Sequence, residues 1–264
     1  MHVNAQGTID SRLDARISII TLNRPAKLNA LTSKMIFAFR EALKAAQSDP
    51  ETLVVLIRGE GNSFCAGDDI AELAGAEENP DQQGELVAAL QDVTRQIMLG
   101  AKPVIAAVHG WAVGAAFSWL LNCDFAVCAE STRAFFPEVT WGLSPTGGAS
   151  TLAPKLLGTG RAREAFFLSR RFTARDLFDF GVATRVVNDG EELSEALSMA
   201  RDLAALPCVA LSGVKRLLNQ ALGDLEAVLT AEMSLAVATA TSPEVARRLA
   251  SRVSGAHGNQ RVNL

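Results

Sequence analysis

The sequence predicts an α/β protein whose last third is entirely helical. Buried strands and amphipathic helices alternate from Ile17 to Val187, which is typical of a sheet covered by helices. The strands read as continuous apolar runs, such as Leu-Val-Val-Leu-Ile over residues 53–57, and such runs favour parallel strands with both faces buried. Beyond residue 190 the pattern changes to successive helices.

Each predicted element rests on a local pattern. The first strand, residues 17–22, is rich in isoleucine and ends at Asn23-Arg24-Pro25. A helix begins at Thr32 or Ser33, because apolar residues then recur at helical spacing. The later predicted strands are residues 53–57, 104–108 and 124–128, and the helices are residues 86–99, 112–121, 191–206, 209–221, 225–239 and 243–251.

Composition narrows the chemistry. The chain has 264 residues, of which 48% are apolar, enough for a substantial buried core. The 25 Lys and Arg against 29 Asp and Glu give a net charge of −4, so no field over the whole molecule attracts nucleic acid. There is no Tyr and there are only three His. The composition therefore disfavours a histidine-rich metal site and excludes a tyrosine general acid. We expect catalysis to depend on carboxylates and backbone groups, without a metal.

Cysteine usage and the N-terminus favour a cytoplasmic protein. The four cysteines form no C-x-x-C pair, which fits a reducing compartment, and residues 1–6 do not resemble a secretory signal. Residues 103–121 lack charge over nearly the length of a membrane span. Glycines at 110 and 114 divide this stretch, so we expect a buried strand, a turn and a buried helix, and no membrane association.

Two segments carry a chemical pattern. Residues 59–70 follow a predicted strand and contain Ala66-Gly67, whose small side chains let a ligand approach the main chain. Residues 109–118 follow another strand and open a helix, whose first N–H groups have no partner within the helix. Two such N–H donors aimed at one point would stabilise an oxyanion. Taken singly, each segment is also compatible with a tight turn between a strand and a helix.

Together with other motifs, these segments resemble the enoyl-CoA hydratase/isomerase (crotonase) superfamily from about Ile17 to Val187. The resemblance rests on residues 22–25 (Leu-Asn-Arg-Pro), 28–30 (Leu-Asn-Ala), 64–70 (Phe-Cys-Ala-Gly-Asp-Asp-Ile), 102–110 (Lys-Pro-Val-Ile-Ala-Ala-Val-His-Gly), 123–124 (Cys-Asp), 136–139 (Phe-Pro-Glu-Val) and 142–145 (Gly-Leu-Ser-Pro). It implies a spiral of ββα units over residues 1–190 that binds an acyl-CoA. It also implies a C-terminal helical region, residues 191–264, that assembles a homotrimer or a dimer of trimers. Coenzyme A is then part of the thioester substrate, and no separate cofactor is expected.

The resemblance also implies roles for individual residues. The backbone N–H groups of Ala66 and Ala115 would hold the thioester oxygen, and Glu138 would be the catalytic acid–base. Ser118 stands where hydratases of the family carry a second glutamate, and a serine hydroxyl is a poor general base without an activating partner. Thr146 stands where another branch of isomerases carries its acid. The coenzyme A end would lie near Arg24, Ala26, Lys27, Leu28, Ala66, Asp69 and Ile70.

The predicted function is enoyl-CoA double-bond isomerisation, because one carboxylate can remove a proton at C2 and return it at C4. Burial of Glu138 against neighbouring aromatic residues is expected to raise its pKa toward neutral pH. The alternatives are an enoyl-CoA hydratase or another lyase or hydrolase of the superfamily, and an acyl-CoA-binding protein without catalysis. Asp68 and Asp69 could also form a carboxylate pair or a metal site, but adjacent side chains usually point apart. For His109 a structural hydrogen bond is favoured over catalysis.

Overall fold

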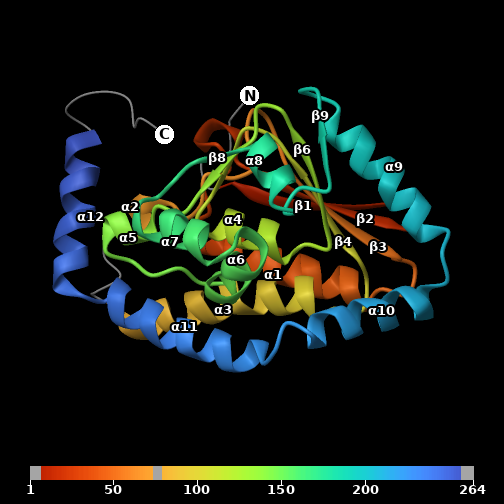
Figure 1. The fold of residues 1–264 in the computed structure, drawn as a ribbon. Coiled ribbons are helices and arrows are strands. Elements are labelled where there is room, and N and C mark those ends of the chain that lie inside the picture. The colour runs from red at the N-terminus through yellow and green to blue at the C-terminus, as the bar shows by residue number, and fades with distance from the viewer. Residues whose placement is uncertain (1–6, 74–78, 257–264) are drawn as a thin grey trace.

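The computed structural model describes residues 7–73 and 79–256, and it contains two sheets (Figure 1). The larger sheet has the order β1-β2-β3-β4-β6-β9, in which β1 is antiparallel to β2 and all other pairs are parallel. Its strands are β1 (Thr8–Asp14), β2 (Ile17–Asn23), β3 (Val54–Gly59), β4 (Val104–Val108), β6 (Phe125–Ala129) and β9 (Arg185–Val187). The smaller sheet joins β5 (Trp111–Val113), β7 (Arg133–Phe135) and β8 (Phe172–Thr173).

The central strands of the larger sheet, β2, β3, β4 and β6, are buried on both faces, as the apolar runs predicted. Alternate residues of β3 point to opposite sides, because the side-chain period of a strand is two. Val55 and Ile57 enter the main core beneath α1 (Ser33–Ser48) and α3 (Pro80–Met98), while Val54 and Leu56 meet α9 (Glu192–Ala204) on the other face. The predicted α/β fold with parallel strands and a helical C-terminal region is confirmed.

The uncharged stretch forms two strands and a buried helix. We predicted a helix over residues 112–121, but residues 111–113 form β5 and α4 (Ala115–Asn122) begins after Gly114. Gly114 has φ 57°, a left-handed value that glycine adopts without strain, and this residue turns the chain from the strand into the helix. Every residue of α4 is buried, and Trp119 packs on Phe39 of α1 with ring centroids 4.8 Å apart.

The C-terminal helices wrap around the core (Figure 1). α11 (Leu225–Ala240) lies along α3, and α12 (Pro243–Ala256) packs against α2 (Ile70–Leu73) and α5 (Glu138–Trp141). α10 (Cys208–Gln220) joins α9 to α11, and the predicted division at residue 190 falls between β9 and α9. The remaining helices are the 3₁₀ turn η1 (Pro25–Lys27), α6 (Ala149–Leu157), α7 (Thr159–Phe167) and α8 (Ala174–Asp179).

In the part of the chain that the structure describes, no single helix is both long and apolar enough to cross a membrane. Taken together, α9 and α10 meet that length and composition, but a bend of 109° separates them.

Candidate active site

The two segments that the sequence singled out are hydrogen-bonded neighbours. The N–H of Cys65 donates to the Trp111 carbonyl oxygen (2.8 Å), and the N–H of Val113 donates to the Cys65 carbonyl oxygen (3.0 Å). On the opposite side, the N–H of Leu31 donates to the carbonyl oxygen of Gly67 (2.8 Å). Residues 63–69 are therefore held between β5 and the chain that follows η1, close to the first turn of α4.

One of the two predicted N–H donors is available and the other is not. Ala115 is the first residue of α4, and its N–H has no partner among the described residues. The N–H of Ala66 instead donates to the Leu28 carbonyl oxygen (2.9 Å), so it cannot hold a thioester oxygen as predicted. The N–H of Asp68 has no partner in the described part of the chain, and this group is the one left to accompany Ala115.

Gly67 explains this change of donor. In a regular extended chain, N–H groups three residues apart point to opposite sides. Those of Ala66 and Asp69 nevertheless both donate to the 28–31 segment, to Leu28 and Leu31 respectively. Gly67 lies between them with φ 84°, and this left-handed residue turns the chain so that the Asp68 N–H points away from that segment.

Glu138 is the first residue of α5, and its carboxyl group is enclosed. Oε1 lies against Gly114, where an added methyl group would come within 2.9 Å of it. Oε2 is buried without a hydrogen-bond partner. Burial raises the pKa of Glu138 to about 8, the negative charge of Asp68 adds to the rise, and the backbone N–H of Glu138 itself opposes it. The pKa shift toward neutral pH that the sequence predicted is thus present.

Asp68 brings a second carboxyl group to the same place. Its Oδ1 is buried without a partner, and burial raises its pKa to about 6. Asp68 and Glu138 line one cavity of about 40 Å³, together with Leu73, Gln83, Leu86, Val87, Leu90, Ala115, Leu143, Ser144, Thr146, Ala236, Thr239 and Ala240. The position of Asp68 in this cavity was not predicted, because from the sequence Asp68 was considered only as a pair with the adjacent Asp69.

Unpartnered polar atoms concentrate in this cavity. Among the described residues, six buried side-chain nitrogen or oxygen atoms have no hydrogen-bond partner, and the cavity is lined by the residues of three of them: Asp68, Glu138 and Ser144. Leaving a buried polar atom unpaired costs about 1–3 kcal/mol, so folded proteins keep few such atoms. Their convergence on one small cavity marks it as the candidate active site.

Asp69 points away from this cavity, as expected for an adjacent side chain. Its Oδ2 lies 2.6 Å from a guanidinium nitrogen of Arg24, and the same nitrogen donates to the Ala30 carbonyl oxygen (3.0 Å). Both side chains are largely buried, so this ion pair fixes η1 to the start of α2. Arg24 and Asp69 are thus already paired with each other, and their predicted contact with coenzyme A stays a prediction.

The other residues expected near coenzyme A lie around this ion pair. Ala26 and Lys27 are exposed on η1, and the Leu28 carbonyl oxygen holds Ala66. Ile70 opens α2 and packs among the apolar residues beside α12. The contacts of Ala26, Lys27, Leu28, Ala66 and Ile70 with coenzyme A stay predictions.

Ser118 is not part of the cavity wall. It is buried in α4, and its hydroxyl lies 3.5 Å from the Gly114 carbonyl oxygen. His109 pairs through Nε2 with the Gly61 carbonyl oxygen at 2.9 Å, a contact that fits the structural role favoured from the sequence. Thr146 does line the cavity, but a threonine hydroxyl is not a carboxylic acid.

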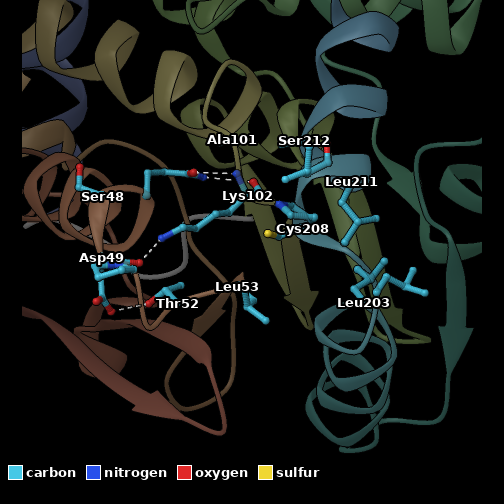
Figure 2. Close-up of a pocket in the computed structure, with 15 residues that line it drawn as sticks. Ser48, Asp49, Thr52, Leu53, Ala101, Lys102, Leu203, Cys208, Leu211 and Ser212 are labelled. Carbon is cyan, nitrogen blue, oxygen red and sulfur yellow. Dashed lines mark hydrogen bonds between the residues drawn. The ribbon is translucent and has the colours of Figure 1, made fainter.

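A larger cavity of about 260 Å³ lies elsewhere, between the end of α1 and α10 (Figure 2). Its lysine, Lys102, reaches across to the Asp49 carbonyl oxygen, and its ammonium group also donates to the Ala46 carbonyl oxygen (2.7 Å). The lysine is thus held by the fold, and this cavity is not preferred as an active site. Among the described residues, no cluster of His, Cys, Asp and Glu could hold a metal ion.

Comparison with known proteins agrees with this geometry. Residues 12–251 match the family model described as enoyl-CoA hydratase/isomerase. The chain is 32% identical over 188 residues to a crotonyl-CoA hydratase of Syntrophomonas wolfei, covering 71% of this chain and 72% of that protein. It is 36% identical over 199 residues to a carnitinyl-CoA dehydratase of Salmonella enteritidis, covering 75% of each.

A solved structure shows the same fold. An enoyl-CoA hydratase/isomerase from Mycobacterium paratuberculosis superposes with a TM-score of 0.88 at 26% identity, covering 95% of this chain and 100% of that one. The predicted crotonase fold is therefore confirmed. By its matching residues and its fold, this chain belongs to the enoyl-CoA hydratase/isomerase family of acyl-CoA enzymes.

Proposed function

We propose that the protein converts a 3-enoyl-CoA into the conjugated 2-enoyl-CoA through a thioester enolate. The N–H groups of Asp68 and Ala115 hold the thioester oxygen, on which negative charge grows as a C2 proton leaves. The ionised carboxylate of Glu138 removes that proton and returns it at C4, so a single residue serves as base and then as acid. The family's acyl-CoA chemistry is common to its members, while the isomerisation is our proposal for this chain.

The observation that carries the proposal is the unpartnered Oε2 of Glu138 in the cavity that Ala115 also lines. The burial that raises its pKa to about 8 brings proton uptake and release close to neutral pH. The cavity of about 40 Å³ has room for roughly three water molecules. The wall of this cavity includes Ala236, Thr239 and Ala240 of α11, which an acyl chain entering it would contact.

Hydration of 2-enoyl-CoA is the second candidate. The relatives named above include a crotonyl-CoA hydratase and a carnitinyl-CoA dehydratase, and both names imply the transfer of water. Water-sized space beside Glu138 also favours this reaction. Hydration needs a second acid–base group, which Ser118 cannot supply from its buried position in α4.

The proposal extends to assembly and location. α10 exposes several large apolar side chains, among them Val209, Leu217 and Leu218, and such a surface favours burial between subunits. We propose that residues 191–264 assemble a homotrimer or a dimer of trimers, which light scattering after gel filtration would measure. The proposed location is the cytoplasm, since the four cysteines are free thiols. Proton transfer needs no cofactor beyond the coenzyme A of the substrate.

The test compares the protein with its Glu138→Gln variant on 3-enoyl-CoA and 2-enoyl-CoA. We expect the unchanged protein to form 2-enoyl-CoA from 3-enoyl-CoA, and the glutamine variant to be slower by about 10²–10⁴-fold. Full isomerase activity in the variant would refute the role of Glu138. Binding of acyl-CoA without any turnover by the unchanged protein would identify a non-catalytic binding protein.

A further inference from the structure

The side chain of Asp68 makes no hydrogen bond or ion pair with the described residues that would explain its burial. Its Oδ1 makes no hydrogen bond although it is buried, and burial raises its pKa to about 6. Its neighbour Asp69, by contrast, is paired with Arg24. A buried carboxyl oxygen that the fold leaves unpaired is costly unless a ligand or water uses it.

Asp68 faces the same space as the proposed proton carrier. Asp68 and Glu138 both line the cavity of about 40 Å³, and among the described residues of its wall they are the two that can exchange a proton near neutral pH. Each has an unpartnered buried oxygen. The negative charge of Asp68 adds to the rise in the pKa of Glu138 that burial causes.

We propose that Asp68 is a second catalytic carboxylate, which works with Glu138 across this cavity to add water to the C2–C3 double bond of 2-enoyl-CoA. The proposal rests on the proposed function, since it uses the same oxyanion donors and the same Glu138. It gives the protein a second activity, hydration, on the product of the isomerisation. The acid–base group absent at Ser118 is thereby supplied from a different element, the loop after β3.

The chemical steps balance with no further reactant. The Asp68 carboxylate takes a proton from a water molecule while the water oxygen forms a bond to C3. The electron pair of the C2–C3 double bond moves toward the thioester, whose oxygen becomes an enolate held by the N–H groups of Asp68 and Ala115. The carboxylic acid of Glu138 gives its proton to C2, which yields 3-hydroxyacyl-CoA. Transfer of the proton from Asp68 to Glu138 restores the starting state.

The pKa values of the two carboxyl groups are consistent with Asp68 as the base and Glu138 as the acid. With pKa values of about 6 for Asp68 and about 8 for Glu138, the pair at neutral pH holds one proton, mainly on Glu138. Hydration begins from this state, whereas isomerisation begins from ionised Glu138. We therefore expect hydration to be fastest between about pH 6 and 8, and isomerisation to keep rising up to about pH 8.

The experiment measures both reactions in the unchanged protein and in three variants: Asp68→Asn, Asp68→Glu and Asp81→Asn. Hydration is followed in ¹⁸O-labelled water, since the hydroxyl oxygen of the product must come from water. Isomerisation is followed by liquid chromatography of quenched 3-enoyl-CoA reactions, which separates the two enoyl-CoA isomers of equal mass. Asn at position 68 keeps the backbone N–H, and Asp81 is an exposed acid on α3 that controls for loss of charge. Circular dichroism checks that each variant is folded.

We expect Asp68→Asn to lower hydration by about 10²–10⁴-fold. Isomerisation should instead rise at neutral pH, because loss of the neighbouring charge lowers the pKa of Glu138 and leaves more of it ionised. Asp68→Glu should restore part of the hydration, and Asp81→Asn should change neither reaction.

Three outcomes would overturn the inference: hydration unchanged in Asp68→Asn, equal loss of both reactions in that folded variant, or an unchanged protein that isomerises without hydrating. The last outcome leaves the proposed function intact. An unchanged protein that catalyses neither reaction would instead defeat the proposed function itself, so the two failures are distinguishable.

Discussion

Replacing Glu138 by glutamine is expected to remove proton transfer and also to stabilise the fold at alkaline pH. Glutamine keeps the shape of the side chain but cannot exchange a proton, so isomerisation should fall by about 10²–10⁴-fold. The stabilising effect has a separate origin. The buried carboxyl group loses its hydration, which disfavours the ionised form and raises the pKa from 4.5 to about 8.

The size of this effect follows from the two pKa values. The folded protein keeps the Glu138 proton up to about pH 8, whereas the unfolded chain releases it near pH 4.5. The contribution to stability is complete below the unfolded pKa and is lost progressively as the pH rises through the folded pKa. At about 1.4 kcal/mol per pKa unit, the loss between these limits is roughly 5 kcal/mol. The Glu138→Gln variant does not lose this stability at high pH, because glutamine has no proton to release in this range.

Urea unfolding near pH 5, 7 and 9 measures the difference directly. The free energy of unfolding of Glu138→Gln, relative to the unchanged protein, should increase with each step in pH. Glu85→Gln, at an exposed position of α3, is the matched control and should show no such trend. A constant difference between Glu138→Gln and the unchanged protein over this pH range would refute the claim that the Glu138 carboxyl group is desolvated.

Two further predictions concern the same site, and a third concerns the contact between α11 and α6. The kcat/KM of isomerisation should rise by about tenfold per pH unit up to about pH 8, because the free enzyme must carry ionised Glu138; a pH profile that is flat from 6 to 8 would contradict this. Ala115→Pro removes one oxyanion donor at a helix position that tolerates proline, so kcat/KM should fall by about 10²–10³-fold. A cooperative thermal unfolding transition would show that the variant is folded. Retention of activity would exclude that donor. Glu232 is buried in α11 and accepts hydrogen bonds from the N–H of Gly148 (2.7 Å) and from the N–H and hydroxyl of Ser150. Glu232→Gln should therefore lower the free energy of unfolding by about 1.5–3 kcal/mol in urea titrations, and an unchanged value would show that this link between α11 and α6 contributes little.

Long buried elements could be predicted from the sequence because their patterns are local. The strand at residues 53–57 and the helix from Thr32 or Ser33 appear in the structure as β3 and α1, within one or two residues at their starts. Short elements were missed or shifted. β5 was taken as the first turn of α4, because its three residues are as apolar as the helix that follows. Its pairing with β7 is a contact between distant residues, which no local pattern announces.

The candidate site could be predicted in part for the same reason. Glu138 and Ala115 were found from their motifs, and the structure brings both to one cavity. The assignment of Ala66 failed because a hydrogen bond to Leu28, distant in sequence, occupies its N–H. The left-handed Gly67 was visible as a glycine, but which neighbouring N–H it would turn outward depends on the segments on both sides.

The sequence by itself determined the family, the alternation of strands and helices, and the scarcity of histidine and tyrosine that directs the chemistry to carboxylates and backbone N–H groups. These properties are local, since each depends on residue types and their spacing. Three properties were decided only by the tertiary structure: which N–H groups have no hydrogen-bond partner, the burial of Ser118 in α4, and the cavity that Asp68 and Glu138 both line. Hydrogen-bond satisfaction and desolvation depend on every segment packed around an atom, and for this reason they are decided by the fold as a whole.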